Sequence, residues 1–387
     1  MNMRNEAAVL VQPPMVGAIR ATRAIFLLSG IGMASWASMV PYAKARLGLD
    51  DADLGLVLLA FGGGSMLSMP LIGVLTHRYG NRKVIGVAGL LLCLAIPLLA
   101  LAPSVFMLTA TLLYFGAMLG AVDVAMNAHA VEVERRDGRV LMSGFHGLFS
   151  IGGLAGAAIM SGLLALGLPL SACATAIALL LALIMLSQWR SLLPEVDDAA
   201  ERSAMLRLPQ GLVLLLGLLC FVSFLAEGSM LDWSAVLLRD FRGFPAASSG
   251  IGYACFSLAM AAGRLGGDRL IRRLGPVWAV RLGAGAAAVG FLLAAMAPWR
   301  PLSLAGFVLI GLGASNIVPV MFSAAGRLPG TSPAISIATV TTLGYAGLLS
   351  GPALIGFLAH ASSLPIALAV VAGLLLLVAA AAGIVRR

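Results

Sequence analysis

The 387-residue chain has few of the residues that enzymes and metalloproteins use. Only 11% of its residues are charged, and it contains four cysteines and four histidines. The cysteines lie inside apolar runs without Cys-x-x-Cys spacing, and the histidines show no ligand spacing, so neither a disulfide nor a metal site is expected. No Walker phosphate loop and no Ser/His/Asp arrangement stands out. The sequence therefore predicts a protein that is not an enzyme, has no catalytic residues, metal or cofactor, and does not use ATP.

Long apolar runs make up almost all of the rest. Hydrophobic residues account for 60% of the chain, and its mean hydropathy is +1.02. A run of about 20 apolar residues crosses a hydrocarbon core of about 30 Å, and without water to bind its backbone groups it must be a helix. We expect twelve spans, at 21–43, 53–76, 84–102, 104–131, 141–166, 168–188, 209–238, 247–268, 276–298, 301–325, 333–359 and 362–385. The first could instead be a removable signal peptide, but the eleven that follow favour a membrane helix.

The excess of positive charge is explained by orientation in a membrane. The net charge is +9 and the pI about 10.1, which in a soluble protein would suggest a nucleic-acid partner. With a cytoplasmic N-terminus, 20 of the 25 Lys and Arg residues, Arg264 among them, lie on the cytoplasmic side. The exceptions are Lys44, Arg46, Arg239, Arg242 and Arg300. This positive-inside pattern predicts a multi-pass protein of the bacterial inner (plasma) membrane, with both termini cytoplasmic and no nucleic-acid partner.

A polar segment divides the spans six and six. Residues 189–208 form the longest polar interruption, with Pro194 and four acidic residues. We therefore predict an N-terminal six-helix bundle at 1–188, a cytoplasmic linker at 189–208 and a C-terminal six-helix bundle at 209–387.

The two halves resemble each other at an offset of about 190–197 residues. The matches are Gly120-Ala-Val-Asp123 with Gly313-Ala-Ser-Asn316, Ser35-Trp36 with Asp232-Trp233, and the basic turn 76–83 with 268–275. Chance similarity between apolar segments is the alternative, but three matches near one offset argue against it. Duplicated six-helix units are typical of a transporter architecture whose substrate binds between the repeats, near the membrane midplane.

Three polar residues, Asp123, Glu227 and Asn316, lie deep inside apolar spans. A charge at bilayer depth costs about 2.5–3.5 kcal/mol on insertion scales, so it normally faces the protein interior or a wet cavity. Asp123 shares a helix face with Asn127, one turn later. We predict that Asp123 and Glu227 handle a proton, and that Glu227 and Asn127 contact a polar substrate. A purely structural role for Asp123, accepting hydrogen bonds that pin its helix, is the alternative.

Other polar and aromatic residues are weaker candidates for the same site. His146 could relay protons from Asp123, or could be solvated near its helix end. Asn316, one turn before Pro319, suggests a locally opened helix whose amide serves either a substrate or helix packing. Further candidate substrate contacts are Ser150, which shares a face with His146, and the amphipathic aromatics Trp36, Tyr253 and Tyr345, which could stack on a substrate ring or simply pack.

Two loops carry a recognisable motif. The first is Gly73-Val-Leu-Thr-His77-Arg78-Tyr-Gly80-Asn-Arg82-Lys83, and the second is Gly263-Arg264-Leu-Gly-Gly-Asp268-Arg269-Leu-Ile-Arg272-Arg273-Leu-Gly275. The first resembles the loop signature G-x-x-x-D-R-x-G-x-R-K of the major facilitator superfamily, with His77 where an Asp is usual. The resemblance implies two pseudo-symmetric six-helix bundles and a gating role for the motif residues. These are Gly73, Arg78, Gly80, Arg82, Arg264, Asp268 and Arg269, which would hold the cytoplasmic side closed until their contacts break. The alternative is that these loops only set the topology.

Within that superfamily the chain is most similar to the fucose–proton symporter branch and its bacterial relatives. The similarity rests on Asp123-Val-Ala-Met-Asn127, on the small polar and aromatic run 143–153, and on residues 226–234. It implies proton symport. Sugar symporters of this branch carry an acid in their first helix, and the first span here has none. Either Glu227 takes that second role or the substrate is not a free sugar.

The sequence therefore predicts a monomeric, proton-coupled secondary transporter of a small polar solute such as a sugar, working by alternating access. A proton-coupled exporter of drugs or metabolites is the first alternative. A membrane protein that does not transport, such as a sensor, is the second.

Overall fold

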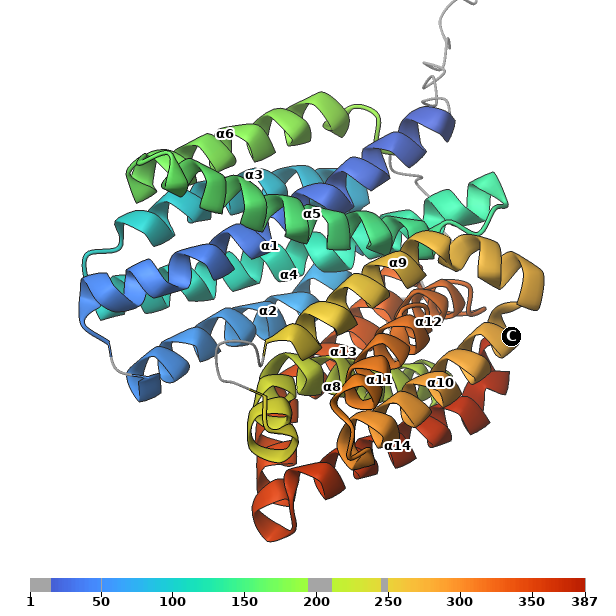
Figure 1. The fold of residues 1–387 in the computed structure, drawn as a ribbon. Helices are drawn as coiled ribbons and strands as arrows, with labels where there is room; N and C mark the ends of the chain where they lie inside the picture. The colour runs from blue at the N-terminus through green and yellow to red at the C-terminus, as the bar shows by residue number, and fades with distance from the viewer. Residues whose placement is uncertain (1–14, 50, 194–210, 245–249, 387) are drawn as a thin grey trace, which may run out of the picture.

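The computed structural model describes residues 15–49, 51–193, 211–244 and 250–386, which are helical almost throughout (Figure 1). The helices of the first half are α1 (Met15–Leu47), α2 (Asp51–Tyr79), α3 (Asn81–Leu101), α4 (Val105–Asp137), α5 (Met142–Ala165) and α6 (Leu170–Trp189). Those of the second half are α8 (Gly211–Val236) with the π-turn η2 (Leu237–Phe241), α9 (Ile251–Leu274), α10 (Pro276–Met296), α11 (Arg300–Ala314), α12 (Ile317–Ala325), α13 (Pro333–Ala361), α14 (Leu364–Ala381) and the 3-10 turn η4 (Ala382–Arg386). Within these ranges there is no β-strand.

The described segments account for the twelve predicted spans. Eleven are long and apolar enough to cross a membrane when α8 is counted with η2 and α11 with α12. The twelfth is α9, which carries Arg264, Asp268 and several further arginines toward its end. The predicted all-α fold with twelve membrane helices is confirmed. Most of the predicted linker, from residue 194 on, and the first 14 residues lie outside the described ranges, so the domain boundaries stay a prediction.

Each half packs its helices in the same arrangement. The main pairs of the first half are α1 with α5, α2 with α4, α3 with α4 and α3 with α6. Their counterparts in the second half are α8 with α13, α9 with α11, α10 with α11 and α10 with α14. Small residues allow the close approach that holds helices together in lipid. A Cβ added at Gly30 would overlap the Phe149 carbonyl across α1 and α5, and one at Gly347 would overlap the Phe221 carbonyl across α13 and α8.

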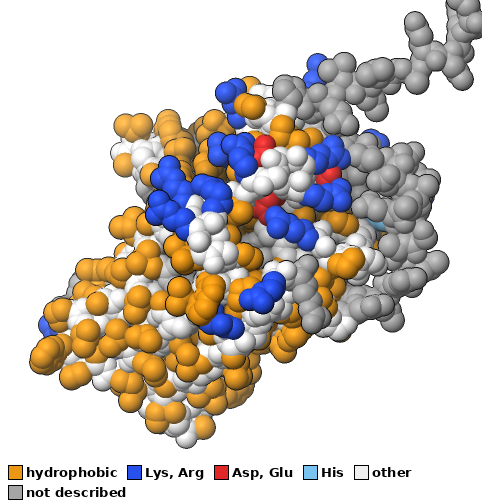
Figure 2. Space-filling model, turned by 90° about the vertical axis from the view of Figure 1, so that its right-hand side faces the viewer, with side chains coloured by type: hydrophobic (Ala, Val, Ile, Leu, Met, Phe, Trp, Pro, Cys, Tyr) orange, Lys and Arg blue, Asp and Glu red, His pale blue; other side chains and the backbone are white. Residues whose placement is uncertain are grey.

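The two halves meet mainly through α2 against α13 and α5 against α9. One end of the molecule, which we call the latch end, holds the start of α1 and the end of α14 (Figure 1). Lys and Arg side chains gather on this face (Figure 2). The exposed basic residues here include Arg20, Arg23, Arg78, Lys83, Arg135, Arg139, Arg269, Arg272, Arg273, Arg281, Arg327 and Arg386. The charge pattern of the sequence predicts that the latch end is cytoplasmic.

Two of the cations predicted for the opposite side cap helix ends. Arg46 donates hydrogen bonds to carbonyl groups in the last turn of α3. Arg242, at the matching place in the second half, does the same for the last turn of α10. A cation at a helix C-terminus satisfies free carbonyls and complements the helix dipole. These arginines therefore stabilise helix ends, which explains their presence on the side where the positive-inside rule predicts few cations.

Candidate substrate and proton site

The two buried acids come from opposite halves and approach one aromatic residue. Asp123 lies on α4 and Glu227 on α8, and both are half-buried. Tyr345, on α13, lies within electrostatic range of both carboxylates. Its ring packs against Phe224 on α8, with ring centroids 5.7 Å apart. The structure thus brings together three of the residues that the sequence singled out.

Asp123 begins a hydrogen-bonded chain inside the first half. The Asn127 amide nitrogen donates to the Asp123 backbone oxygen at 2.8 Å and to its carboxylate at 3.4 Å. The Asn127 amide oxygen therefore faces the other way and accepts from His146 Nε2 on α5 at 3.1 Å. Asn127 is fully buried and His146 is 9% exposed. Among the described residues, no cation lies within ion-pair distance of Asp123.

His146 is enclosed by aromatic rings, so it is not a solvated residue at a helix end. The Phe26 ring on α1 lies 5.2 Å from the imidazole, and the Phe322 ring on α12 lies 5.8 Å from it. Phe322 belongs to the second half, so His146 lies where the halves meet. The chain of Asp123, Asn127 and His146 fits a proton path, a role that stays a prediction.

Glu227 differs from Asp123 in having a cationic partner. Arg264 Nη2, on α9, lies 3.3 Å from Glu227 Oε1 and 3.4 Å from Oε2. The side chains are 10% exposed for Arg264 and 17% for Glu227. The sequence analysis counted Arg264 among the cations of the cytoplasmic side. The structure places it inside α9, one helical turn before Asp268, where its side chain is buried in the protein. Its predicted gating role remains untested.

Arg264 also joins the two halves. Its Nη1 donates to Ser150 Oγ on α5 at 3.3 Å, and its Nε donates to the Ser315 backbone oxygen at 3.4 Å. Ser150 in turn donates to the His146 backbone oxygen at 3.3 Å. A continuous set of polar groups therefore runs from Asp123, through His146 and Ser150, to Arg264 and Glu227.

The remaining predicted substrate contacts are less well placed. The helix break predicted at Asn316 is present between α11 and α12. The Asn316 amide donates to the Gly263 backbone oxygen at 3.2 Å and to Ser315 Oγ at 2.8 Å, contacts expected of a residue that holds helices together. Trp36 is buried in the first half, and Tyr253 packs on Phe256 with ring centroids 5.9 Å apart. Substrate roles for all three stay predictions.

The second motif loop contacts the opposite half. Both Asp268 oxygens accept from the Gly144 backbone N–H in the first turn of α5, at 3.1 and 3.2 Å. A Cβ at Gly144 would press against that carboxylate. Arg272, one turn further along α9, donates to the Val140 backbone oxygen at 3.4 Å. The contact predicted for Asp268 is therefore present, and its gating function stays a prediction.

The first motif loop makes the matching contact with different chemistry. His77 Nδ1 lies 3.2 Å from the hydroxyl of Ser332, which is the N-cap of α13. Gly73 lies against Ala338 on the same helix. Gly80 and Gly275 both adopt positive φ, of 83° and 78°, directly after their helices, which explains why the motif needs glycine there. Gly275 follows Asp268 by seven residues, whereas Gly80 follows His77 by three. The difference arises because α9 continues for about one turn more after Asp268 than α2 does after His77.

Sequence analysis missed a third contact between the halves. Glu134, at the end of α4, is 2% exposed and accepts from the backbone N–H groups of Leu141 at 2.9 Å and Met142 at 3.0 Å. It also forms an ion pair with Arg327, just beyond α12. These positions differ by 193, which is the offset that relates Asp123 to Asn316. Because opposite charges stand at matching positions of the two halves, the repeat could have pointed to the pair of Glu134 and Arg327.

His129 also has a place that the sequence did not reveal. Its Nε2 accepts from the Leu193 backbone N–H at 3.0 Å, and its Nδ1 lies 3.2 Å from the Thr22 hydroxyl. It therefore anchors the start of the predicted linker to α4 and α1.

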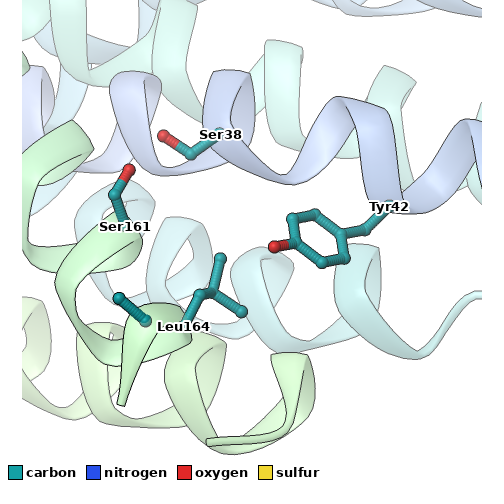
Figure 3. Close-up of a pocket in the computed structure, with 5 residues that line it drawn as sticks. Ser38, Tyr42, Ser161 and Leu164 are labelled. Carbon is teal, nitrogen blue, oxygen red and sulfur yellow. The ribbon is translucent and has the colours of Figure 1, made fainter. Parts of the chain in front are cut away.

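A separate pocket of about 370 Å³ lies between α1 and α5, toward the end opposite the latch end (Figure 3). Ser38, Tyr42, Ser161, Leu164 and Ala165 line it. None of the candidate residues lies in this pocket. Within the described ranges, no group of three His, Cys, Asp or Glu side chains is placed to hold a metal ion.

Comparison with known proteins agrees with this geometry. Residues 24–334 match the Major Facilitator Superfamily. An uncharacterised transporter of this type from Yersinia pestis is 49% identical over 368 residues, covering 95% of each chain. The E. coli fucose:proton symporter FucP, in its outward conformation, has a TM-score of 0.78 at 18% identity, covering 94% of this chain and 98% of its own. A human organic anion transporter has a TM-score of 0.76 at 20% identity, covering 96% of this chain and all of its own. The two solved structures show a shared fold, and the match along the sequence shows the family: the chain belongs to the Major Facilitator Superfamily.

Proposed function

We propose that the protein is a proton-coupled secondary active transporter that carries a small polar solute by alternating access between two bundles. One observation carries the proposal. Two half-buried carboxyl groups from opposite halves lie within electrostatic range of Tyr345, and only Glu227 has a cation beside it among the described residues. Binding a proton removes the penalty of leaving Asp123 charged at this depth, so Asp123 is suited to gain and lose a proton as the site changes its exposure.

The neighbours of Asp123 support a coupling role. Asn127 can donate to the carboxylate or accept from the carboxylic acid after its amide rotates, so it can serve both states. His146 continues the chain toward the interface of the halves and can relay the proton. Glu227 and Ser150, from opposite halves, both bind Arg264, at the interface where a solute would meet both bundles.

The contacts at the latch end support alternating access. Asp268 with Gly144, His77 with Ser332, and Glu134 with Arg327 each join one half to the other. All three lie at one end, so they can break together when the bundles rock. If the latch end is cytoplasmic, as the charge pattern predicts, the structure corresponds to an outward-facing state.

The two alternatives have less support. A non-transporting sensor would be favoured if both buried acids were paired, but Asp123 has no cationic partner in the described part of the chain. An exporter would be favoured by a site dominated by Met and Phe. Phenylalanines do pack against His146 and Tyr345 here, but the groups linked across the site are acids, an amide, a histidine, a serine and an arginine.

The test is transport in proteoliposomes with an imposed proton gradient, after a thermal-shift screen has identified a solute. We expect Asp123→Asn to exchange labelled solute across the membrane without accumulating it, because the neutral amide imitates a permanently protonated carrier. Asp232→Asn, which changes an exposed acid on α8, is the matched control and should accumulate solute like the unaltered protein. Accumulation by Asp123→Asn against a gradient would overturn the proposal.

A further inference from the structure

The least expected group in the centre of this protein is a buried arginine. Arg264 is 8% exposed and lies between the halves. Glu227 from its own half and Ser150 from the other half both contact its guanidinium. Burying an arginine is favourable only when a negative charge and hydrogen-bond acceptors satisfy it.

Glu227 leaves part of the hydrogen-bonding capacity of the Arg264 guanidinium unused. Both Glu227 oxygens lie near one nitrogen, Nη2, at 3.3 and 3.4 Å, so the pair is not the two-nitrogen fork that a carboxylate can form with a guanidinium. A charge-assisted hydrogen bond is normally about 2.7–2.9 Å long, so these contacts are loose. Nη1 has a neutral hydroxyl at 3.3 Å. A second carboxylate could therefore bind Nη1 and Nη2 together with better geometry than Glu227 has.

If the ion pair between Arg264 and Glu227 separates, the buried guanidinium must find another negative partner. Arginine does not give up its proton in proteins, whereas a carboxylate readily accepts one. If Glu227 takes a proton from solvent water, Arg264 still needs a negative partner. A cationic solute bound to Glu227 would leave Arg264 unpaired, and a neutral solute would supply no charge. Once Glu227 is protonated, only an anion restores the net charge that the ion pair had.

We infer that the transported solute is a small organic anion whose carboxylate takes the place of Glu227 on Arg264, while Glu227 becomes a carboxylic acid. This inference rests on the proposed transport function and names its substrate class. One proton and one negative charge enter the site together, so binding is itself coupled to proton uptake.

Several other groups face Glu227 and must be separated from its effect. Arg264 lies on α9, Tyr345 on α13 and Cys220 on α8 itself. Asp123, on α4 of the other half, lies within electrostatic range of Tyr345. His146 on α5 lies within electrostatic range of Arg264. Variants at position 227 isolate the contribution of Glu227 because the other groups stay in place.

The inference can be tested with formate, the smallest carboxylate, and with formamide, its neutral counterpart of similar shape. Glu227→Ala removes the carboxylate from Arg264 and leaves space for formate. We expect formate to raise the thermal unfolding temperature of purified Glu227→Ala and to bind it about tenfold more tightly than the unaltered protein at neutral pH. Formamide should have no such effect. Asp232→Asn, which loses an exposed acid on the same helix as Glu227, should respond to formate like the unaltered protein.

Two further variants complete the design. The double variant Glu227→Ala with Arg264→Gln should lose the formate effect, because the cation that binds the anion is gone. Glu227→Gln keeps the shape of the side chain and serves if Glu227→Ala does not fold. In the unaltered protein, formate affinity should rise as the pH is lowered from mildly alkaline to mildly acidic, because Glu227 must be protonated. In Glu227→Gln it should not vary with pH.

The inference is overturned if formate stabilises neither variant at position 227, if formamide acts equally well, or if the double variant still responds. Such a result would leave proton-coupled transport intact, since that depends on the Asp123→Asn experiment. Conversely, accumulation by Asp123→Asn would remove the proposed coupling site but not an anion site at Arg264.

Discussion

The two halves of this protein share a helix arrangement but differ in chemistry at matched positions. Asp123 in the first half corresponds to Asn316 in the second, and Glu134 corresponds to Arg327. One half therefore supplies an acid where the other supplies an amide or a cation. The repeated helices provide two similar bundles, and the unequal residues provide the proposed proton site in one half and an ion pair that crosses between the halves.

The two motif loops show the same division. Asp268 accepts a backbone N–H at the start of α5, and His77 contacts the hydroxyl at the start of α13. Both positions hold the end of one helix against the beginning of a helix in the other half. A carboxylate is favoured beside a helix N-terminus by the helix dipole, and an imidazole is not. We expect the Asp268 contact to be the stronger of the two.

Exchanging Asp123 and Asn316 should have the largest effect. We expect the double variant Asp123→Asn with Asn316→Asp to lose all accumulation of solute in proteoliposomes. Asn316 donates its amide to the Gly263 carbonyl, and a carboxylate there would face that oxygen without a proton to donate. Moving the acid to the second half therefore cannot restore the proton site. Accumulation by the exchanged protein would show that the halves are equivalent and would remove the basis of the comparison.

Glu134→Gln should have the next largest effect, on the balance between closed and open latch ends. The change removes the charge that Arg327 and two backbone N–H groups share, at a cost of about 2 kcal/mol, or roughly a thirtyfold shift toward the open latch. Distances between spin labels on the two halves measure that shift. The matched control is Glu132→Gln, because Glu132 pairs only with Arg135 and Arg136 on its own helix.

Reversing the same ion pair would sharpen the result. The double variant Glu134→Arg with Arg327→Glu keeps opposite charges but leaves the Leu141 and Met142 N–H groups without an acceptor. We expect it to remain shifted toward the open latch. Full recovery would mean that charge attraction alone holds the halves, contrary to the buried geometry of Glu134.

Asp268→Asn should have a smaller effect of the same sign. It weakens the hydrogen bond to the Gly144 N–H by about 1 kcal/mol, which shifts the population roughly fivefold toward the open latch. The same spin-label distances provide the measurement. Unchanged distances would show that this contact does not hold the halves together and would contradict the gating role predicted for the second motif.

The features that depend on local sequence were predictable. Apolar runs fixed the number and order of the helices, the four-residue spacing placed Asn127 over Asp123, and Pro319 after Asn316 marked the break in the helix. The match between the halves also indicated the repeated packing. In a membrane each long apolar run has few alternatives to a helix, so local pattern decides most of the fold.

The contacts between the halves could not be read in the same way. Arg264 lies in a motif rich in basic residues, and its position one turn before Asp268 brings it against Ser150 of the other half as well as Glu227 of its own. Glu134 and Arg327 look like ordinary charges at helix ends until the two bundles are placed together. Such pairs depend on how two surfaces meet, and side-chain spacing within one helix carries no information on that.

The smallest effect is expected at His77, which stands where the loop signature usually has an Asp. His77→Asp would place a carboxylate beside the Ser332 hydroxyl and the N-terminus of α13, as Asp268 does for α5. We expect it to favour the closed latch by about 0.5 kcal/mol, or roughly twofold, because a helix dipole acting on a partly exposed charge contributes little more. His77→Ala should shift the population slightly the other way, since the contact with Ser332 is lost. If both changes open the latch, the imidazole itself is required, and the two loops hold the halves by different means.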